Sequence, residues 1–120
     1  MAGYNWFAGK SNNAVWAEEV EGKVTKSKIT AAWLRRNGIN ETATFIKFLI
    51  TADVIWPDEW HHTSKYFNET DYYSAETIAE TLAELEEDGH LAIWREMSKI
   101  PALRHADEYV IRREFLRRLN

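Results

Sequence analysis

The chain has 120 residues, of which 45% are hydrophobic and 28% charged, as expected for one globular domain over residues 1–120. It contains no cysteine, which excludes disulfide bonds, thiol catalysis and cysteine-ligated zinc. No apolar run is long enough to span a bilayer, and the first ten residues lack the basic-then-apolar layout of a secretory signal. We therefore expect a cytoplasmic protein with no membrane contact.

The net charge of −4 is unevenly distributed along the chain. Residues 1–50 contain seven Lys or Arg against four Asp or Glu, residues 51–95 contain two against eleven, and residues 96–120 contain six against four. An acidic middle between two basic ends favours a partner with a basic surface. Bulk nucleic acid is less favoured as a partner, because it is bound by domains that are basic overall. The alternative is that the acidic segment is a solvated helix face.

Two helices are predicted near the N-terminus. The first covers residues 11–20 and is ended by Gly22. The second begins at Thr25 or Ser27 and is ended by Gly38, with two arginines in its last turn where the helix dipole favours them.

A third helix is predicted from the cap residue Asn40 to Pro57, which disfavours α geometry in the residue before it. The β-branched content leaves a strand over residues 43–50 as an alternative. Residues 57–73 follow as a connector rich in aromatic side chains, with a short helix at Pro57 and a turn at residues 68–71.

The clearest predicted helix begins after Ser74 and is ended by Gly89. Its buried stripe is predicted to contain Ala75, Ile78, Leu82 and Leu85. Its solvated face is predicted to contain Glu76, Glu80, Glu84 and Glu87.

The last thirty residues allow two interpretations. In the first, helices cover residues 90–99 and 106–120 and are separated by Pro101. In the second, residues 91–94 and 109–111 pair as a short C-terminal β-hairpin. We favour the helices, so the predicted fold is mainly α, a compact bundle of about five helices, with the hairpin as the α+β alternative.

The two helices around residues 37–40 have the order of a helix-turn-helix but not its spacing. Apolar residues are needed about six and nine positions after the turn glycine, where this chain has Thr44 and Lys47. A plain helical hairpin is the simpler interpretation. The alternative function is a small DNA-binding transcriptional regulator that uses residues 23–50. Its nucleic-acid-binding residues would be Lys23, Lys26, Lys28, Arg35 and Arg36.

The adjacent histidines His61 and His62 are the obvious candidates for a metal or acid–base site, and a protein centred on them is a third hypothesis. Side chains of adjacent residues point about 100° apart on a helix and to opposite faces of a strand, so both rarely reach one ion. No HExxH motif or phosphate loop accompanies them. We therefore predict no catalytic residue, metal or cofactor, and expect these histidines to bind backbone groups.

The runs EWHHTSKYFNETDYY and GKSNNAVWAEEVEGKVTKSK resemble a group of small uncharacterised proteins carried by phages and related mobile elements. The resemblance covers residues 6–73 and does not extend to the arginine-rich tail after Trp94. It carries no catalytic motif and implies a context: short, acidic phage proteins without cysteine are often inhibitors of host defence, including anti-CRISPR proteins. Many of these bind the basic nucleic-acid channel or a subunit interface of an effector without performing chemistry.

Our first hypothesis is therefore a binding protein that inhibits a host defence protein or nucleoprotein complex by contact with a basic surface. Its acidic helix would present carboxylates to Lys and Arg that normally hold phosphate, while aromatic side chains would provide a buried anchor. A homodimer is an open alternative for the oligomeric state. The predicted partner-binding residues are Trp60, Tyr66, Tyr72, Glu76, Glu80, Glu84 and Glu87.

Overall fold

The structure is a computed structural model that describes residues 19–20, 22–58 and 71–120. The strands are β1 (Glu19–Val20), β2 (Lys23–Thr25) and β3 (Tyr72–Ser74). The helices are the 3₁₀-helix η1 (Lys26–Lys28) and the α-helices α2 (Ala31–Arg36), α3 (Ala43–Thr51), α4 (Ala75–Glu87), α5 (Leu91–Ser98), α6 (Pro101–Arg104) and α7 (Glu108–Leu119). The predicted mainly α fold is thus confirmed, and a small sheet accompanies the helices.

The three strands form one antiparallel sheet in the order β1-β2-β3. Val24 of β2 lies opposite Tyr73 of β3, and both side chains are buried in the core. Because β3 ends where α4 begins, the pairing of β2 with β3 fixes the position of the first turn of α4.

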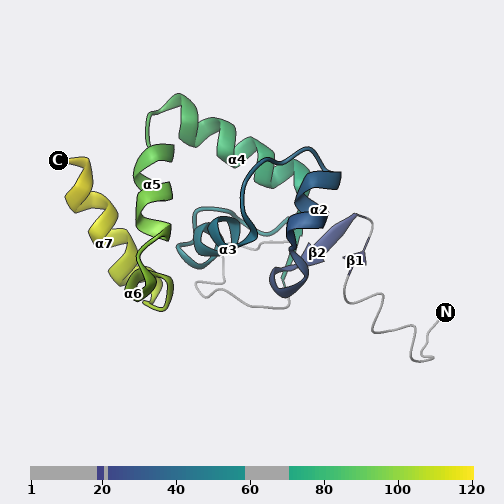
Figure 1. Cartoon of the computed structure of the whole chain (residues 1–120), viewed down its shortest axis with the longest axis horizontal. Helices are drawn as coiled ribbons and strands as arrows, with labels where there is room; N and C mark the ends of the chain where they lie inside the picture. Colours follow the sequence, from purple (N-terminus) through teal and green to yellow (C-terminus); the bar gives the residue numbers. More distant parts are fainter. Residues whose placement is uncertain (1–18, 21, 59–70) are drawn as a thin grey trace.

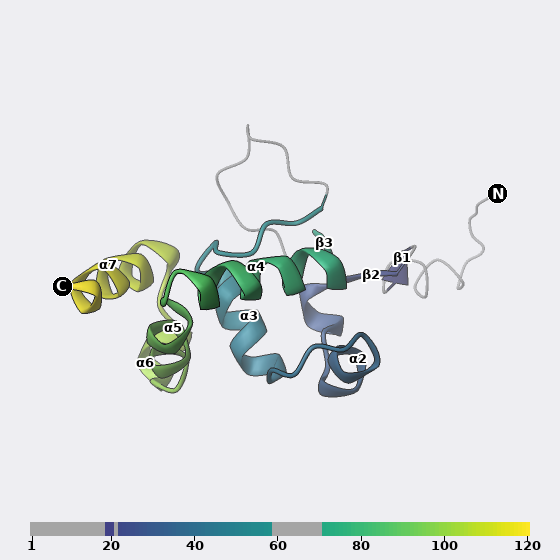
Figure 2. The ribbon, with the colours of Figure 1, turned by 90° about the horizontal axis from the view of Figure 1, so that it is seen from above.

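Helix α4 extends from the sheet to α5, beyond which α7 forms the end of the described structure (Figures 1 and 2), and α4 contacts both β3 and α5. Its predicted stripe is confirmed, because Ile78 and Leu85 are buried and Ala75 and Leu82 are packed against the same hydrophobic cluster. The opposite side of α4 therefore faces solvent.

An aromatic stack holds α3, α5 and α7 together. The ring of Trp94 in α5 lies parallel to that of Phe115 in α7, with 4.2 Å between centroids and 12° between planes. The same indole meets Phe48 of α3 edge to face, at 6.0 Å and 62°. Trp94 and Phe48 are buried in the same cluster as Ile111 of α7.

Several predicted boundaries in the first half of the chain were wrong. Glu19 and Val20 form a strand instead of the end of a helix, and the remainder of that predicted helix lies outside the described residues. Helix α2 begins after Thr30, whose hydroxyl accepts a hydrogen bond from the backbone N–H of Trp33 at 3.1 Å. Thr25, the predicted start, ends β2 instead.

The third helix is real but shorter at both ends than predicted, and the strand alternative for it is wrong. Thr42, two residues after Asn40, is the N-cap of α3 and accepts from the backbone N–H of Phe45 at 3.1 Å. The helix ends at Thr51 with Ala52 as its C-cap, because Asp53 adopts a left-handed conformation with φ of 62°. Pro57 therefore lies well beyond the end of α3 and does not terminate it.

The C-terminal hairpin alternative is also wrong, because both of its proposed strands are helical, in α5 and α7. Pro101 does interrupt the chain as predicted, and it occupies the first turn of α6. Gly89, with φ of 81°, ends the preceding turn after α4, also as predicted.

Replacing Trp94 by alanine should lower the free energy of unfolding by about 3–5 kcal/mol, because it removes a buried ring from contact with two helices. Urea denaturation followed by circular dichroism measures this. Leu116→Ala on the exposed side of α7 is the control and should change stability by less than about 0.5 kcal/mol. Equal effects of the two substitutions would show that the stack does not hold these helices together.

Candidate acidic interface

The solvent side of α4 carries a row of glutamates, and the helix itself contains no cation to compensate them. The helix contains five Glu and no Lys or Arg, and all five glutamates are exposed. Within the described part of the chain, no ion pair involves any of the four predicted partner-binding glutamates. These four are Glu76, Glu80, Glu84 and Glu87. The structure thus places the four together, as predicted, on one uncompensated surface, which we call the acidic face.

The arrangement of charges on α4 costs helix stability. Glu84 and Glu87 lie near the C-terminus of the helix, whose partial negative charge repels carboxylates, and no basic residue lies in the last turn. Glu76, Glu80 and Glu84 are also four residues apart in sequence, the spacing at which like charges destabilise a helix. Helix stability alone therefore does not explain this charge pattern.

The first turn of α4 is fixed by a cluster of hydroxyl and carboxylate groups. The Ser74 hydroxyl accepts a hydrogen bond from the backbone N–H of Thr77 at 3.1 Å, which confirms the predicted cap. The same hydroxyl donates to Asp58 Oδ1 at 3.1 Å, and the Thr77 hydroxyl donates to the same oxygen. The backbone N–H of Asp58 in turn donates to the carbonyl of Tyr72 at 3.0 Å. Residues 58, 72 and 74 are thereby held together at the N-terminal end of the acidic face.

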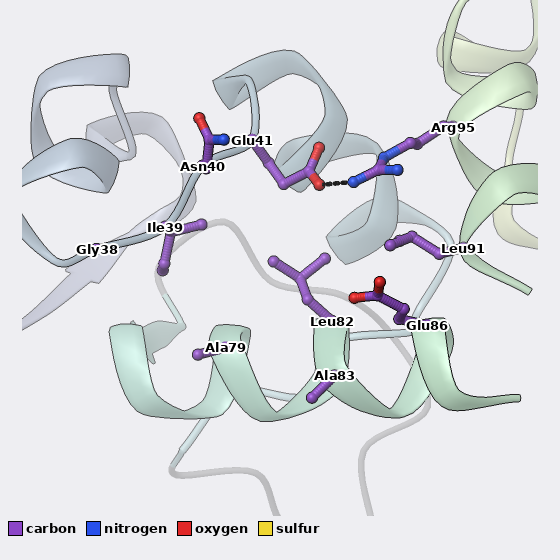
Figure 3. Close-up of a pocket in the computed structure, with 10 residues that line it drawn as sticks. All are labelled: Gly38, Ile39, Asn40, Glu41, Ala79, Leu82, Ala83, Glu86, Leu91 and Arg95. Atoms are coloured by element: carbon purple, nitrogen blue, oxygen red, sulfur yellow. Dashed lines mark hydrogen bonds and ion pairs between the residues drawn. The ribbon is translucent and has the colours of Figure 1, made fainter. Parts of the chain in front are cut away.

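A hollow of about 340 Å³ lies beside the acidic face, between α4, α5 and the segment formed by residues 38–41 (Figure 3). Leu82 and Leu91 give it apolar walls, and Glu86 lies at its edge. On the α4 side it is completed by Ala79 and Ala83, whose small side chains leave the space open.

The ion pair between Arg95 of α5 and Glu41 closes one side of this hollow (Figure 3). The Glu41 side chain is 14% exposed and that of Arg95 is 49% exposed, so the guanidinium remains accessible to solvent. The hydrogen bond that Arg95 donates to Glu41, together with the charges of Glu41 and Glu86, raises the pKa of Arg95 above its usual value.

A second hollow, of about 390 Å³, lies on the other side of the Arg95–Glu41 pair and has the opposite electrostatic character. Besides this pair, its charged lining residues are Lys99 and Arg104. Arg104 donates to the carbonyl of Ser98 at 2.9 Å, and Lys99 pairs with Glu96 at 3.2 Å. The ion pair thus separates an acidic hollow from a basic one.

The sequence did not reveal a carboxyl pair between the end of α3 and the start of α7. Burial raises the pKa of Asp53 to about 6, and the neighbouring Glu108 raises it further through its negative charge and its hydrogen bonding to Asp53. The positive charge of Arg112 opposes this shift, because its guanidinium lies 3.9 Å from Asp53 Oδ2; the same guanidinium also pairs with Glu108 at 2.9 Å. The left-handed backbone conformation of Asp53 brings its side chain close to Glu108. The spacing of apolar residues in the sequence does not predict such a conformation.

An exposed apolar strip on α7 was also missed. Tyr109 is 72% exposed and Leu116 is 59% exposed, and they lie seven residues apart on one side of the helix, with the Arg113 guanidinium 5.2 Å from the Tyr109 ring centroid. The spacing was visible in the sequence, but Ile111 and Phe115 form an equally regular stripe. Periodicity alone could not decide which stripe was buried.

The residues of the alternative nucleic-acid site are distributed over three elements. Lys23 lies in β2, Lys26 and Lys28 lie in η1, and Arg35 and Arg36 are exposed in the last turn of α2. The helix that would have to enter a DNA groove, α3, buries five of its nine residues in the core. It therefore offers no face for reading bases.

Several predicted residues lie outside the described part of the chain, namely Trp60, His61, His62 and Tyr66. Tyr72 is half-buried in β3, immediately before the first turn of α4. Among the described residues, no group of three His, Cys, Asp or Glu side chains could hold a metal ion. The described helices also include none with the length and apolar character needed to cross a membrane.

Comparison of the chain with protein-family models, with curated proteins and with solved structures gave no significant match.

The carboxyl pair should make stability depend on pH. Because the pKa of Asp53 is raised from 3.8 to about 6, the group contributes stability that is fully present below about pH 3.8 and is lost as the pH rises through 6. Asn tolerates the left-handed conformation and carries no charge. Asp53→Asn should therefore have a higher free energy of unfolding than the wild type at pH 7, and this difference should become smaller toward pH 4. Denaturation of both proteins between pH 4 and pH 7 measures this difference in the free energy of unfolding.

Glu108→Gln is the companion variant, since it removes the repelling charge and should reduce the pH dependence contributed by Asp53. A difference in the free energy of unfolding between Asp53→Asn and the wild type that stays constant from pH 4 to pH 7 would contradict the raised pKa of Asp53.

Proposed function

We propose that this chain is a phage-type, non-enzymatic inhibitor that acts in the host cytoplasm by covering a basic, nucleic-acid-binding surface of a defence protein or nucleoprotein complex. The observation that supports this function best is the acidic face of α4, which is exposed and whose four glutamates form no ion pair within the described part of the chain. The resemblance of residues 6–73 to phage and mobile-element proteins supplies the biological context of the proposal.

The charge density of α4 suits a surface built to hold nucleic acid. A helix rises 1.5 Å per residue, so the four glutamates of the acidic face follow one another along the helix axis at about 5–6 Å on average. One DNA strand carries one phosphate per about 3.4 Å of its axis. Lys and Arg side chains arranged along a phosphate backbone would therefore meet a row of countercharges on α4 whose spacing is of the same order.

The energetic cost of the acidic face supports a role in binding. Positions 84 and 87 would stabilise the helix if they were lysine, since cations are favoured near a helix C-terminus. Departures from such local rules are expected where a surface serves binding. The C-terminal part of α4 is moreover tied to the core by Leu85 and by α5, so the fold tolerates the cost.

The proposal is tested by affinity capture from nuclease-treated host lysate, followed by mass spectrometry. We expect a protein partner that survives nuclease treatment, dissociates with added salt and is displaced by duplex DNA or heparin, because these polyanions compete for the same basic surface. Capture of nucleic acid alone would instead support the DNA-binding alternative.

The variant Glu84→Lys/Glu87→Lys should separate binding from folding. It should raise the free energy of unfolding by about 0.3–1 kcal/mol per substitution and yet weaken capture at least ten-fold, because it places cations against a basic surface. Glu96→Lys on α5 adds a positive charge away from the acidic face and is the control that should keep capture within about two-fold. Unchanged capture by the double variant would rule out the acidic face as the contact surface.

A further inference from the structure

We infer that the hollow beside α4 is a binding site for one arginine side chain of the partner, with the stem on its apolar walls and the guanidinium at Glu86. This inference rests on the proposed function, because it assumes a partner with a basic surface. It assigns a specific contact to a region that is lined by none of the predicted partner-binding residues that the structure describes.

The size of the hollow suits one long side chain. Its volume of about 340 Å³ is at the lower end of the range in which proteins hold small ligands, roughly 300–1,000 Å³. Ala79 and Ala83 leave the α4 side open, while Leu82 and Leu91 offer apolar surface. Long cationic side chains gain from such surface, since they bury a hydrocarbon stem and keep the charged group at the rim.

The charge of the hollow favours a cation. Its lining contains two carboxylates, Glu41 and Glu86, and one guanidinium, Arg95, which leaves one negative charge uncompensated. The acidic face continues along the same helix, so a basic partner drawn to that face would have its side chains beside the opening.

A guanidinium group of the chain itself is already bound at the rim of the hollow. Glu41 holds the guanidinium of Arg95 in a hydrogen-bonded ion pair at the rim (Figure 3), so the site binds this group in cis. A guanidinium is planar and presents several donors, which lets it bridge oxygens from two carboxylates in a way that an ammonium does not. The geometry therefore favours arginine over lysine, and it makes Arg95 a competitor of the incoming side chain.

The experiment is an NMR titration of the labelled protein with the peptide acetyl-Gly-Arg-Gly-amide. We expect saturable shifts centred on the amides of Leu82, Glu86 and Leu91, with millimolar affinity, weaker binding of the lysine peptide and none of the norleucine peptide. Filling the hollow with Ala83→Phe should abolish the shifts, and the exposed position of Ala83 allows the change without disturbing the core.

Two further variants should act in opposite directions. Glu86→Gln should weaken arginine binding about five- to ten-fold, whereas Arg95→Met should tighten it about three-fold or more, because Glu41 loses its internal partner. Glu84→Gln is the matched control: it removes the same charge from the same helix outside the hollow, and binding should stay within about two-fold. If Arg95 instead only supports the shape of the hollow, the substitution Arg95→Met should weaken binding of the arginine peptide.

The inference is overturned if the norleucine peptide binds as well as the arginine peptide, if no saturable shift occurs, or if Glu84→Gln weakens binding as much as Glu86→Gln. The titration uses no partner protein, so its failure leaves the capture experiment intact. Failed capture with a successful titration would retain the arginine site and remove the inhibitor function.

Discussion

Burial of one stripe of α4 determines the surface of this protein. Ile78 and Leu85 are held in the core, and Ser74 and Thr77 fix the first turn through Asp58, so the helix cannot rotate about its axis. A helix with one buried side must present its other side to water. Since the residues available for that side are almost all glutamate, the packing of two apolar side chains positions a row of carboxylates.

The same constraint creates the hollow. At the edge of the buried stripe, α4 carries the small residues Ala79 and Ala83, which do not fill the space that opens toward residues 38–41. A larger residue at either position would close the space without affecting the core, because both alanines are exposed. The acidic face and the hollow are therefore two results of one helix orientation, and a partner that reaches the first also meets the second.

The sequence was sufficient where a single helix carries its own signal. Ser74, the apolar stripe and Gly89 define α4 locally, so its bounds, its buried side and its glutamates were all predictable. The sheet was not predictable, because the pairing of Val24 with Tyr73 joins segments about fifty residues apart and each strand is too short to show alternation. The hollow and the Asp53–Glu108 pair depend in the same way on tertiary packing, which places α5 and α7 against earlier segments.

The formal charges of the chain suggest a basic C-terminal tail, but most of these charges are compensated within the fold. Arg112 pairs with Glu108, Arg117 and Arg118 both pair with Glu114, and Arg113 lies over the ring of Tyr109. The hydrogen bonds from both arginines lower the pKa of Glu114 to about 2, so it is ionised at any physiological pH. The glutamates of the acidic face have no such partners within the described chain. Uncompensated charge, more than net charge, determines the field that a partner meets, and here that field is negative beside α4 and largely cancelled along α7.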